Sequence, residues 1–475
     1  MKRYLRACGL VVAFAIVLSG IYYLSQDTKP NSGVIVFKDK GFEKCLYIAN
    51  DVQYPMTYEQ AATVTKLVLY GYYIIETSDL AYFPNLTTLT IKNQSFRELD
   101  LSQNKMLKYL TCSGNQIRKL DLSQNKMLTY LNCDVNELHE LDLSHNKMLS
   151  FLSCSRNQIS KLDLSYNKLL TYLNCDINEL RELDLSHNKE LSLLSCNKNQ
   201  ISKLDLSQNR MITSLNCDMN ELCELDLSHN KLLTYLNCDM NELYELDLSQ
   251  NKMLSYLTCS GNQIRKLDLS QNKILSFLSY RGNQISKIDL SQNEMLASLN
   301  CDMNQISELD LSRNKLLIFL SCNGNEFNGL DLSQNTLLTY LYCRSSKLVV
   351  IDLSFNVNLD SLMCDYNELE YLDLRNNTRL SYLSCERNRL AIIDFPYPET
   401  SLLTKVNCSG NYLSGTLDLS GYVYLEYLNC YSNFFSDIIF AKDNNVTSFI
   451  YSPSNVPAAR YEEWSRIMHP WITNK

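Results

Sequence analysis

The sequence lacks the short motifs that mark common catalytic sites. No Gly-rich phosphate loop, no GxSxG elbow and no HExxH motif occurs in its 475 residues. Serine and acidic residues are abundant, but they belong to a repeated unit, so their number does not indicate catalysis. We therefore predict a protein that is not an enzyme, with no catalytic residues, no cofactor and no metal site.

An excess of basic residues is also missing. The chain has 44 Lys and Arg against 52 Asp and Glu, which gives a net charge of −8 and an isoelectric point near 5.3. Nucleic-acid-binding proteins usually present a basic patch or stripe. We therefore expect no nucleic-acid partner.

What the chain contains instead is a repeated unit of 21 residues. Residues Leu99–Lys119 and Leu246–Lys266 differ only at position 108 against 255. An LDL or IDL triplet returns in the same register at positions 99, 120, 141, 162, 183, 204, 225, 246, 267, 288, 309, 330, 351 and 372. A fixed period of this size predicts a solenoid, in which each unit buries its apolar edge against its neighbours.

The unit itself indicates how each turn is built. Leu110 and Cys112 are two residues apart, as the buried side chains of a strand are, and the LDL triplet repeats this spacing. Each turn should therefore contain two short extended segments joined by polar corners. Asn115 and Asn125 fall at these corners, where a side-chain amide can bond backbone groups that a bend leaves unpaired.

The pattern LxxLxCxxNxLxxLDLSxN resembles the leucine-rich repeats of bacterial surface proteins of the internalin type. The resemblance implies a leucine-rich-repeat solenoid of mostly short parallel strands and turns, and we expect a gently curved rod with a cap at each end. Two features depart from the family pattern: the period is 21 rather than 22 residues, and no LPxTG-type sorting signal is present at the C-terminus. The family's mode of surface attachment therefore does not carry over. We divide the chain into a signal or anchor, a helical cap, the solenoid and a C-terminal cap, at residues 1–25, 26–61, 62–447 and 448–475.

Three short helices are expected in the caps. In the N-terminal cap, Phe37–Phe42 and Met56–Ala62 resemble the two cap helices of such proteins, with Thr57 and Gln60 forming a capping box. In the C-terminal cap, residues 457–468 can form a helix that covers the last repeat.

The N-terminus predicts export. Lys2, Arg3 and Arg6 precede an uncharged, largely apolar run over residues 7–25. Such a segment is either a cleaved secretory signal or an uncleaved anchor through which the protein contacts the membrane. Positive charge on its N-terminal side places the rest of the chain outside the cytoplasm, at the cell surface or in the extracellular space.

Most of the 18 cysteines form a column with the 21-residue period, which Tyr280 interrupts. Its members are Cys112, Cys133, Cys154, Cys175, Cys196, Cys217, Cys238, Cys259, Cys301, Cys322, Cys343, Cys364 and Cys385. Their Cβ vectors should run parallel, which does not suit disulfides. We therefore predict buried, reduced, unreactive thiols. Cys45 and Cys223 lie off this column.

The aspartates of the LDL triplets form a second column with a single sign of charge. Neighbouring members should lie about 5 Å apart, so their repulsion requires an offsetting interaction. Serine hydroxyls or backbone N–H groups at the corner are the simplest source. A row of calcium ions is the alternative, although one carboxylate per repeat supplies few of the six to eight oxygens that calcium takes.

We place function on the outward-facing positions of the first strand. One column there is aromatic: Tyr109, Tyr130, Phe151, Tyr172, Tyr235, Tyr256, Phe277, Phe319 and Tyr340. A neighbouring column is partly acidic: Asp134, Asp176, Asp218 and Asp239. Aromatic rings beside short polar groups favour recognition of a protein ligand. We expect this recognition to serve adhesion to a host or another cell. Two alternatives stay open: cross-strand packing of the rings, and a structural spacer or glycan-binding wall component.

Overall fold

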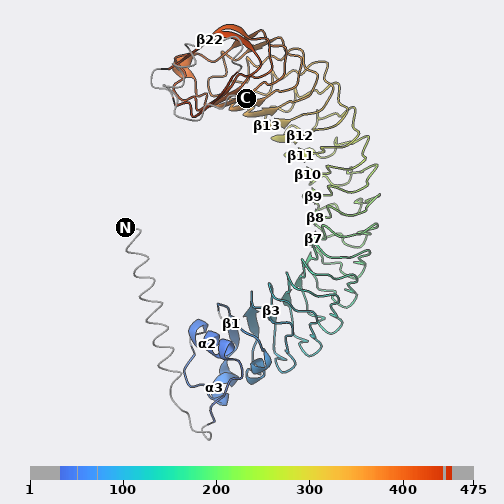
Figure 1. Cartoon of the computed structure of the whole chain (residues 1–475). Helices are drawn as coiled ribbons and strands as arrows, with labels where there is room; N and C mark the ends of the chain where they lie inside the picture. Colours follow the sequence, from blue (N-terminus) through green and yellow to red (C-terminus); the bar gives the residue numbers. More distant parts are fainter. Residues whose placement is uncertain (1–32, 51, 72, 442–444, 452–475) are drawn as a thin grey trace. The chain divides into compact units, whose positions relative to one another are not determined.

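The computed structural model describes residues 33–50, 52–71, 73–441 and 445–451, and the chain divides into two compact units, Met1–Ile212 and Thr213–Lys475. The expected signal or anchor at 1–25 lies outside the described residues, as does the expected helix at 457–468. In each unit one short strand per turn lies beside the strand of the next turn (Figure 1). The predicted solenoid of short parallel strands and turns is therefore confirmed.

The first cap helix differs from the prediction. Helix α2 spans Lys40–Ala49 rather than Phe37–Phe42. It begins there because the Asp39 carboxylate accepts the N–H of Phe42 at 2.8 Å, as an N-cap residue does. Phe37 lies before the helix and is buried, with its ring stacked 5.9 Å from that of Phe42. The sequence pattern placed an aromatic core residue inside the helix.

The second cap helix carries the predicted capping box. Helix α3 spans Tyr58–Thr63, and its N-cap residue Thr57 accepts the N–H of Gln60 through its hydroxyl. The Gln60 side chain accepts the N–H of Thr57 in return. A 3-10 helix, η1, follows at Ser78–Tyr82.

Parallel strands then form the solenoid. In the first unit they are β1 Lys66–Leu69, β2 Thr88–Ile91, β3 Tyr109–Thr111, β4 Tyr130–Asn132, β5 Phe151–Ser153, β6 Tyr172–Asn174 and β7 Leu193–Ser195. In the second unit they are β8 Ser214–Asn216, β9 Tyr235–Asn237, β10 Tyr256–Thr258, β11 Phe277–Ser279, β12 Ser298–Asn300, β13 Phe319–Ser321, β14 Tyr340–Tyr342, β15 Ser361–Met363, β17 Tyr382–Ser384, β19 Lys405–Asn407, β21 Tyr427–Asn429 and β23 Ser448–Ile450. Within each unit, equivalent residues pair from turn to turn, for example Tyr130 with Phe151.

The second extended segment of the turn forms strands only near the C-terminal end of the described chain. These strands are β16 Tyr371–Asp373 paired with β18 Ile392–Asp394, and β20 Ser414–Leu419 paired with β22 Phe434–Phe440. The 3-10 helix η2, Pro398–Thr400, lies between these pairs. The corner asparagine bonds the backbone in the same way in turns with and without these strands, because Asn157 Oδ1 accepts the N–H of Leu138 and Asn388 Oδ1 accepts that of Leu369. The second segment predicted in every turn is thus hydrogen-bonded as strands only in these last described turns.

Both asparagine columns bond the backbone of neighbouring turns, as predicted. Asn136 Nδ2 donates to the carbonyls of Cys112 and Cys133 at 3.1 and 2.9 Å, and its Oδ1 accepts the N–H of Ile117. At the other corner, Asn125 Nδ2 donates to the carbonyls of Leu101 and Asn104. Each amide thus joins successive turns at a bend.

The core is a column of leucine and cysteine side chains. Leu107, Leu110 and Cys112 are fully buried, as are their equivalents in the following turns. Burial raises the pKa of the Cys112 thiol to about 12, and all cysteines of the described residues are free thiols. Cys223 lies off the column and is exposed. The cysteine column therefore acts as small apolar packing, while Cys223 faces solvent.

The aspartate column of the LDL triplets is stabilised by backbone donors. The carboxylate of Asp121 accepts the N–H of Ser123 at 2.9 Å, and that of Asp142 accepts the N–H of Ser144 at the same distance. These hydrogen bonds lower the pKa of both aspartates. Both predicted sources of offset contribute, because the backbone N–H and the side chain of the serine each lower the pKa of the aspartate. Among the described residues, no helix combines the length and apolar character that crossing a bilayer requires.

Candidate recognition surface

The aromatic column of the first unit is a stack of rings on the strand face. Tyr130 and Phe151 lie 4.2 Å apart with an interplanar angle of 9°, and Phe151 and Tyr172 lie 4.1 Å apart at 11°. Tyr109 begins the column and is tilted by 35° at 6.1 Å from Tyr130. Tyr109 is 51% exposed, whereas the other three rings are half-buried. Stacked rings cover each other's faces, so the stack presents mainly ring edges to solvent.

A second stack lies on the strand face of the second unit. Tyr256 lies between Tyr235 and Phe277, with ring centroids 4.5 and 4.3 Å away and interplanar angles of 14° and 5°. The column is interrupted where Ser298 pairs with Phe277 on one side and with Phe319 on the other. One face of the Phe277 ring therefore points toward a position that holds only a serine.

Phe319 and Tyr340 are not stacked in this way. Their centroids are 6.5 Å apart and the rings are inclined by 46°. The edge of Tyr342 contacts Phe319 instead, at 5.5 Å and 89°. The predicted aromatic column is thus two stacks and one irregular pair, and cross-strand packing accounts for the orientation of the stacked rings.

The predicted acidic side chains link successive turns. Asp134 accepts the hydroxyl of Ser153 at 2.7 Å and the N–H of Ser155 at 2.7 Å, both from the next turn. Asp176 accepts the Ser195 hydroxyl and the Asn197 N–H in the same way. Asp239 accepts equivalent groups of Thr258 and Ser260, and Asp218 is half-buried at the equivalent position.

Burial changes the electrostatics of these carboxyl groups. Desolvation raises the pKa of Asp176 and Asp239, while the hydrogen bonds from the next turn act in the opposite direction. Each carboxylate therefore has part of its hydrogen-bonding capacity used inside the solenoid. A partner would meet a face of ring edges and hydroxyl groups more than a row of free carboxylates.

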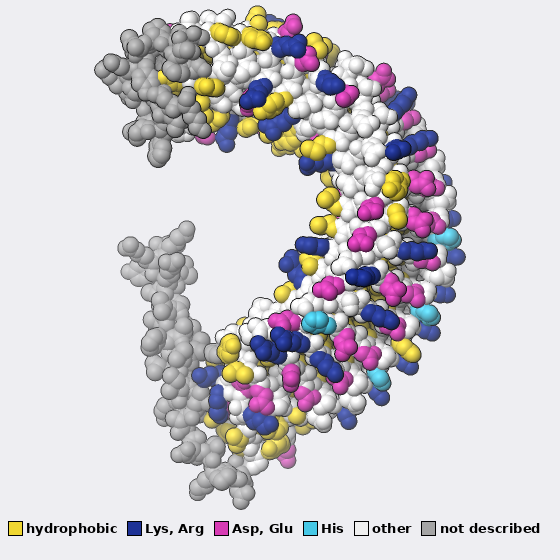
Figure 2. Space-filling model, turned by 45° about the vertical axis from the view of Figure 1, so that its right-hand side comes forward, with side chains coloured by type: hydrophobic (Ala, Val, Ile, Leu, Met, Phe, Trp, Pro, Cys, Tyr) yellow, Lys and Arg dark blue, Asp and Glu magenta, His cyan; other side chains and the backbone are white. Residues whose placement is uncertain are grey.

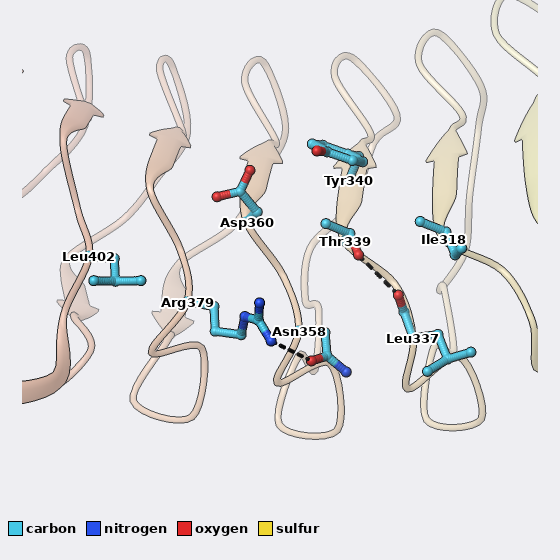
Figure 3. Close-up of a pocket in the computed structure, with 8 residues that line it drawn as sticks. All are labelled: Ile318, Leu337, Thr339, Tyr340, Asn358, Asp360, Arg379 and Leu402. Atoms are coloured by element: carbon cyan, nitrogen blue, oxygen red, sulfur yellow. Dashed lines mark hydrogen bonds between the residues drawn. The ribbon is translucent and has the colours of Figure 1, made fainter.

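A hollow that the sequence did not indicate lies beside the irregular aromatic pair. Its volume is about 480 Å³, and it is open to solvent between successive turns (Figure 3). Its lining residues are Ile318, Leu337, Thr339, Tyr340, Asn358, Asp360, Arg379 and Leu402. Arg379 reaches across it and donates to Asn358 Oδ1 at 3.5 Å. The hollow therefore combines aliphatic walls with one carboxylate and one guanidinium group.

Charged side chains of both signs cover much of the visible surface (Figure 2). In the described part of the chain, no group of three or more His, Cys, Asp or Glu side chains is placed to hold a metal ion.

One feature of the sequence could have indicated the hollow, namely a break in the aliphatic column that includes Leu316 and Leu337. Asn358 and Arg379 replace the aliphatic residue that stands at 316 and 337.

Comparison with known proteins places the chain in a family. No family model and no curated protein sequence matches it. Among solved structures, the functional domain of InlJ from Listeria monocytogenes, which includes a cysteine ladder, is 34% identical, with a TM-score of 0.71 over 74% of this chain and 80% of that one. A leucine-rich-repeat protein of Leptospira interrogans is 21% identical, with a TM-score of 0.60 over 74% of this chain and 92% of that one.

A plant peptide hormone receptor, RGFR1, shares the fold at 20% identity, with a TM-score of 0.64 over 77% of this chain and 70% of the receptor. The cysteine column described above corresponds to the cysteine ladder named for the first of these structures. The chain belongs to the internalin-like leucine-rich-repeat proteins.

Proposed function

We propose that this protein is exported, remains at the cell surface or outside the cell, and binds a protein partner through its strand face. The observation that carries the proposal is the strand face itself. It presents half-exposed aromatic rings beside short hydroxyl and amide side chains, in runs of up to four consecutive turns. Such a surface offers rigid contact area together with adaptable hydrogen bonding.

The solved relatives support a protein ligand. RGFR1 was solved in complex with RGF2, and PEPR1, another protein of this fold, in complex with AtPEP1. The hollow beside Tyr340 would accept an apolar side chain of the partner, with Asp360 and Arg379 available for polar contacts. We further propose that the interaction serves adhesion to a host or another cell.

A glycan ligand is the second candidate, and the orientation of the rings favours it less. Sugars stack on open ring faces, whereas Tyr130, Phe151 and Tyr256 have ring neighbours at 4.1–4.5 Å. Open faces remain only at the ends of the stacks. A purely structural spacer is the third candidate. The function of a spacer would not depend on the exposed side chain of Tyr109.

The partner test compares two tyrosines with nearly the same exposure. Tyr109 lies on the strand face and is 51% exposed, and Tyr166 lies at a corner and is 49% exposed. We expect Tyr109→Glu to weaken binding of the fluorescently labelled chain to target cells, and Tyr166→Glu to leave it unchanged. Protease treatment of the target cells should abolish binding. The protein-binding proposal would be excluded if the two variants bound target cells equally well. It would also be excluded if glycosidase treatment of the cells, but not protease treatment, abolished binding.

Export is tested separately by protease shaving of intact producing cells. Loss of the repeat region, followed by mass spectrometry of the N-terminal fragment, would place the repeats outside and show whether residues 1–25 stay in the membrane. Full protection in unpermeabilised cells would contradict the surface proposal.

A further inference from the structure

A row of basic side chains runs along one corner of the first unit. Stepping by 21 residues from position 105 gives a cation in six consecutive turns, all of them exposed: Lys105, Lys126, Lys147, Lys168, Lys189 and Arg210. Strand spacing places successive turns about 4.8 Å apart. An acidic protein thus carries an uninterrupted linear array of positive charge.

An exposed aliphatic column lies directly beside this array. The residue that follows each cation is Met106, Met127, Met148, Leu169, Glu190 or Met211. Met106, Met148, Leu169 and Met211 are 42–54% exposed. Single exposed apolar residues are ordinary, but Met106, Met127, Met148 and Leu169 follow one another over four adjacent turns and form an apolar stripe, which Glu190 separates from Met211. We call the two columns together the corner ridge.

The corner ridge differs from the other charged columns because its six cations face only one acidic member of the ridge, Glu190. The aspartate column is offset by serine N–H groups, as at Asp121. The column Glu98, Lys119, Glu140 and Lys161 alternates in sign. In contrast, the described residues provide no ion pair to the ridge cations, and Lys147 has only the ring of Tyr166 at 5.7 Å. Like charges at this spacing repel one another, and an anionic ligand would remove that repulsion.

We propose that the corner ridge of the first unit binds an acidic amphipathic α-helix of a partner protein. This inference concerns a surface other than the strand face and does not depend on the strand-face proposal. The helix would lay an apolar stripe on the methionine and leucine column and direct Asp or Glu side chains at the lysines.

The spacing of the two elements agrees. The six turns of the first unit span about 24 Å at the strand spacing, which a helix of about 16 residues would cover, and the cation column continues in the sequence at Lys231, Lys252 and Lys273. The helical pitch of about 5.4 Å differs from the strand spacing by only about 0.6 Å per turn. Flexible lysine side chains can absorb this drift over the length of the ridge.

The pairing of the two columns favours a helix over other anions. A linear polyanion would use the cations and leave the aliphatic column unused. An anionic membrane would take both columns, but it would also bind without any helical partner. An amphipathic acidic helix would use charge and apolar contact together, with a pitch close to the spacing of the turns.

The test uses the full chain and a synthetic acidic peptide of about 16 residues with Leu on one helical face and Glu beside it. A scrambled peptide of the same composition is the control, and binding is followed by fluorescence polarisation. We expect binding of the amphipathic peptide only, weakening as salt increases. Equal binding of the scrambled peptide would overturn the proposal, because it would show simple charge attraction.

Two sets of variants test the two columns. The triple variant Lys126→Gln, Lys147→Gln and Lys168→Gln should weaken peptide binding by about tenfold or more. The matched control, Lys119→Gln, Lys161→Gln and Lys203→Gln, removes the same charge from the alternating column and should change binding little.

The variant Met127→Ser, Met148→Ser and Leu169→Ser should also weaken binding by about tenfold, because the apolar contact is lost. Unchanged binding in this variant would overturn the proposal in favour of a polyanion. Binding of the chain to phosphatidylglycerol vesicles, with no preference for the amphipathic peptide, would overturn it in favour of a membrane surface. The circular dichroism spectra of all variants should match that of the wild type, since every substituted side chain is on the surface.

Discussion

Replacing Tyr256 with Ser tests how much the ring stack contributes to stability. Tyr256 has ring neighbours on both faces, at 4.5 and 4.3 Å. Each stacked pair is worth about 0.5–1.5 kcal/mol beyond the area it buries, so two pairs give about 2 kcal/mol. Serine already occupies this column at Ser298, which shows that the strand accepts it. We therefore expect Tyr256→Ser to lower the free energy of unfolding by about 2 kcal/mol without changing the fold.

Tyr340→Ser is the matched control for this prediction. Tyr340 occupies the same column of the same unit, but its column neighbour Phe319 is tilted by 46° at 6.5 Å. Its loss should therefore cost less than about 1 kcal/mol. Urea titrations followed by far-UV circular dichroism would give both midpoints, with the slope checked for equal cooperativity. Equal losses for the two variants would refute the stacking argument and leave the rings as a surface shaped only for recognition.

Four further predictions concern single residues. Val135→Gly should raise stability by about 0.5–1 kcal/mol in urea titration, because a β-branched residue at φ 55° is strained. Mass spectrometry after alkylation of the native protein should find Cys223 modified and the cysteine column protected, because Cys223 is exposed and the column is buried. Burial raises the folded pKa of Asp176 above its unfolded value, so the wild type loses stability as pH rises through that pKa. Asp176→Asn should remove this loss, and a pH series of thermal unfolding would show it. Tyr280→Cys should destabilise the fold by about 2–4 kcal/mol in urea titration, because a fully buried ring is lost.

The repeating features of the fold were predictable because the same physical requirement recurs in every turn. A cysteine at one position indicates little, whereas a column of them at a constant period can only face the core. The asparagine columns were predictable for the same reason, since every turn has the same bends. Asp121 was predicted to need an offsetting interaction, and the N–H of Ser123 supplies it.

Features that depend on a single local competition were not predictable. Helix α2 begins at Lys40 because the carboxylate of Asp39 accepts the N–H of Phe42. The repeat pattern of the sequence does not indicate this start. The second extended segment forms strands only in the last described turns, although the corner asparagine bonds the backbone alike at Leu138 and at Leu369. The acidic strand-face residues were predicted to bind a partner, and the sequence did not indicate that Asp134 is hydrogen-bonded to the next turn.

Departures from the repeat are the places where one turn can differ from another in function. Identical turns give the same contact many times, so they provide length and avidity but cannot position a partner at one site. In the second unit, Ser298 interrupts the ring stack, Tyr280 interrupts the cysteine column, and Asn358 ends an aliphatic column beside the hollow. A substitution toward the repeat consensus is usually stabilising, yet Tyr280→Cys would remove a fully buried ring. Its expected cost would show that the neighbouring turns have adapted to the departure, as they would if that part of the solenoid were under its own selection.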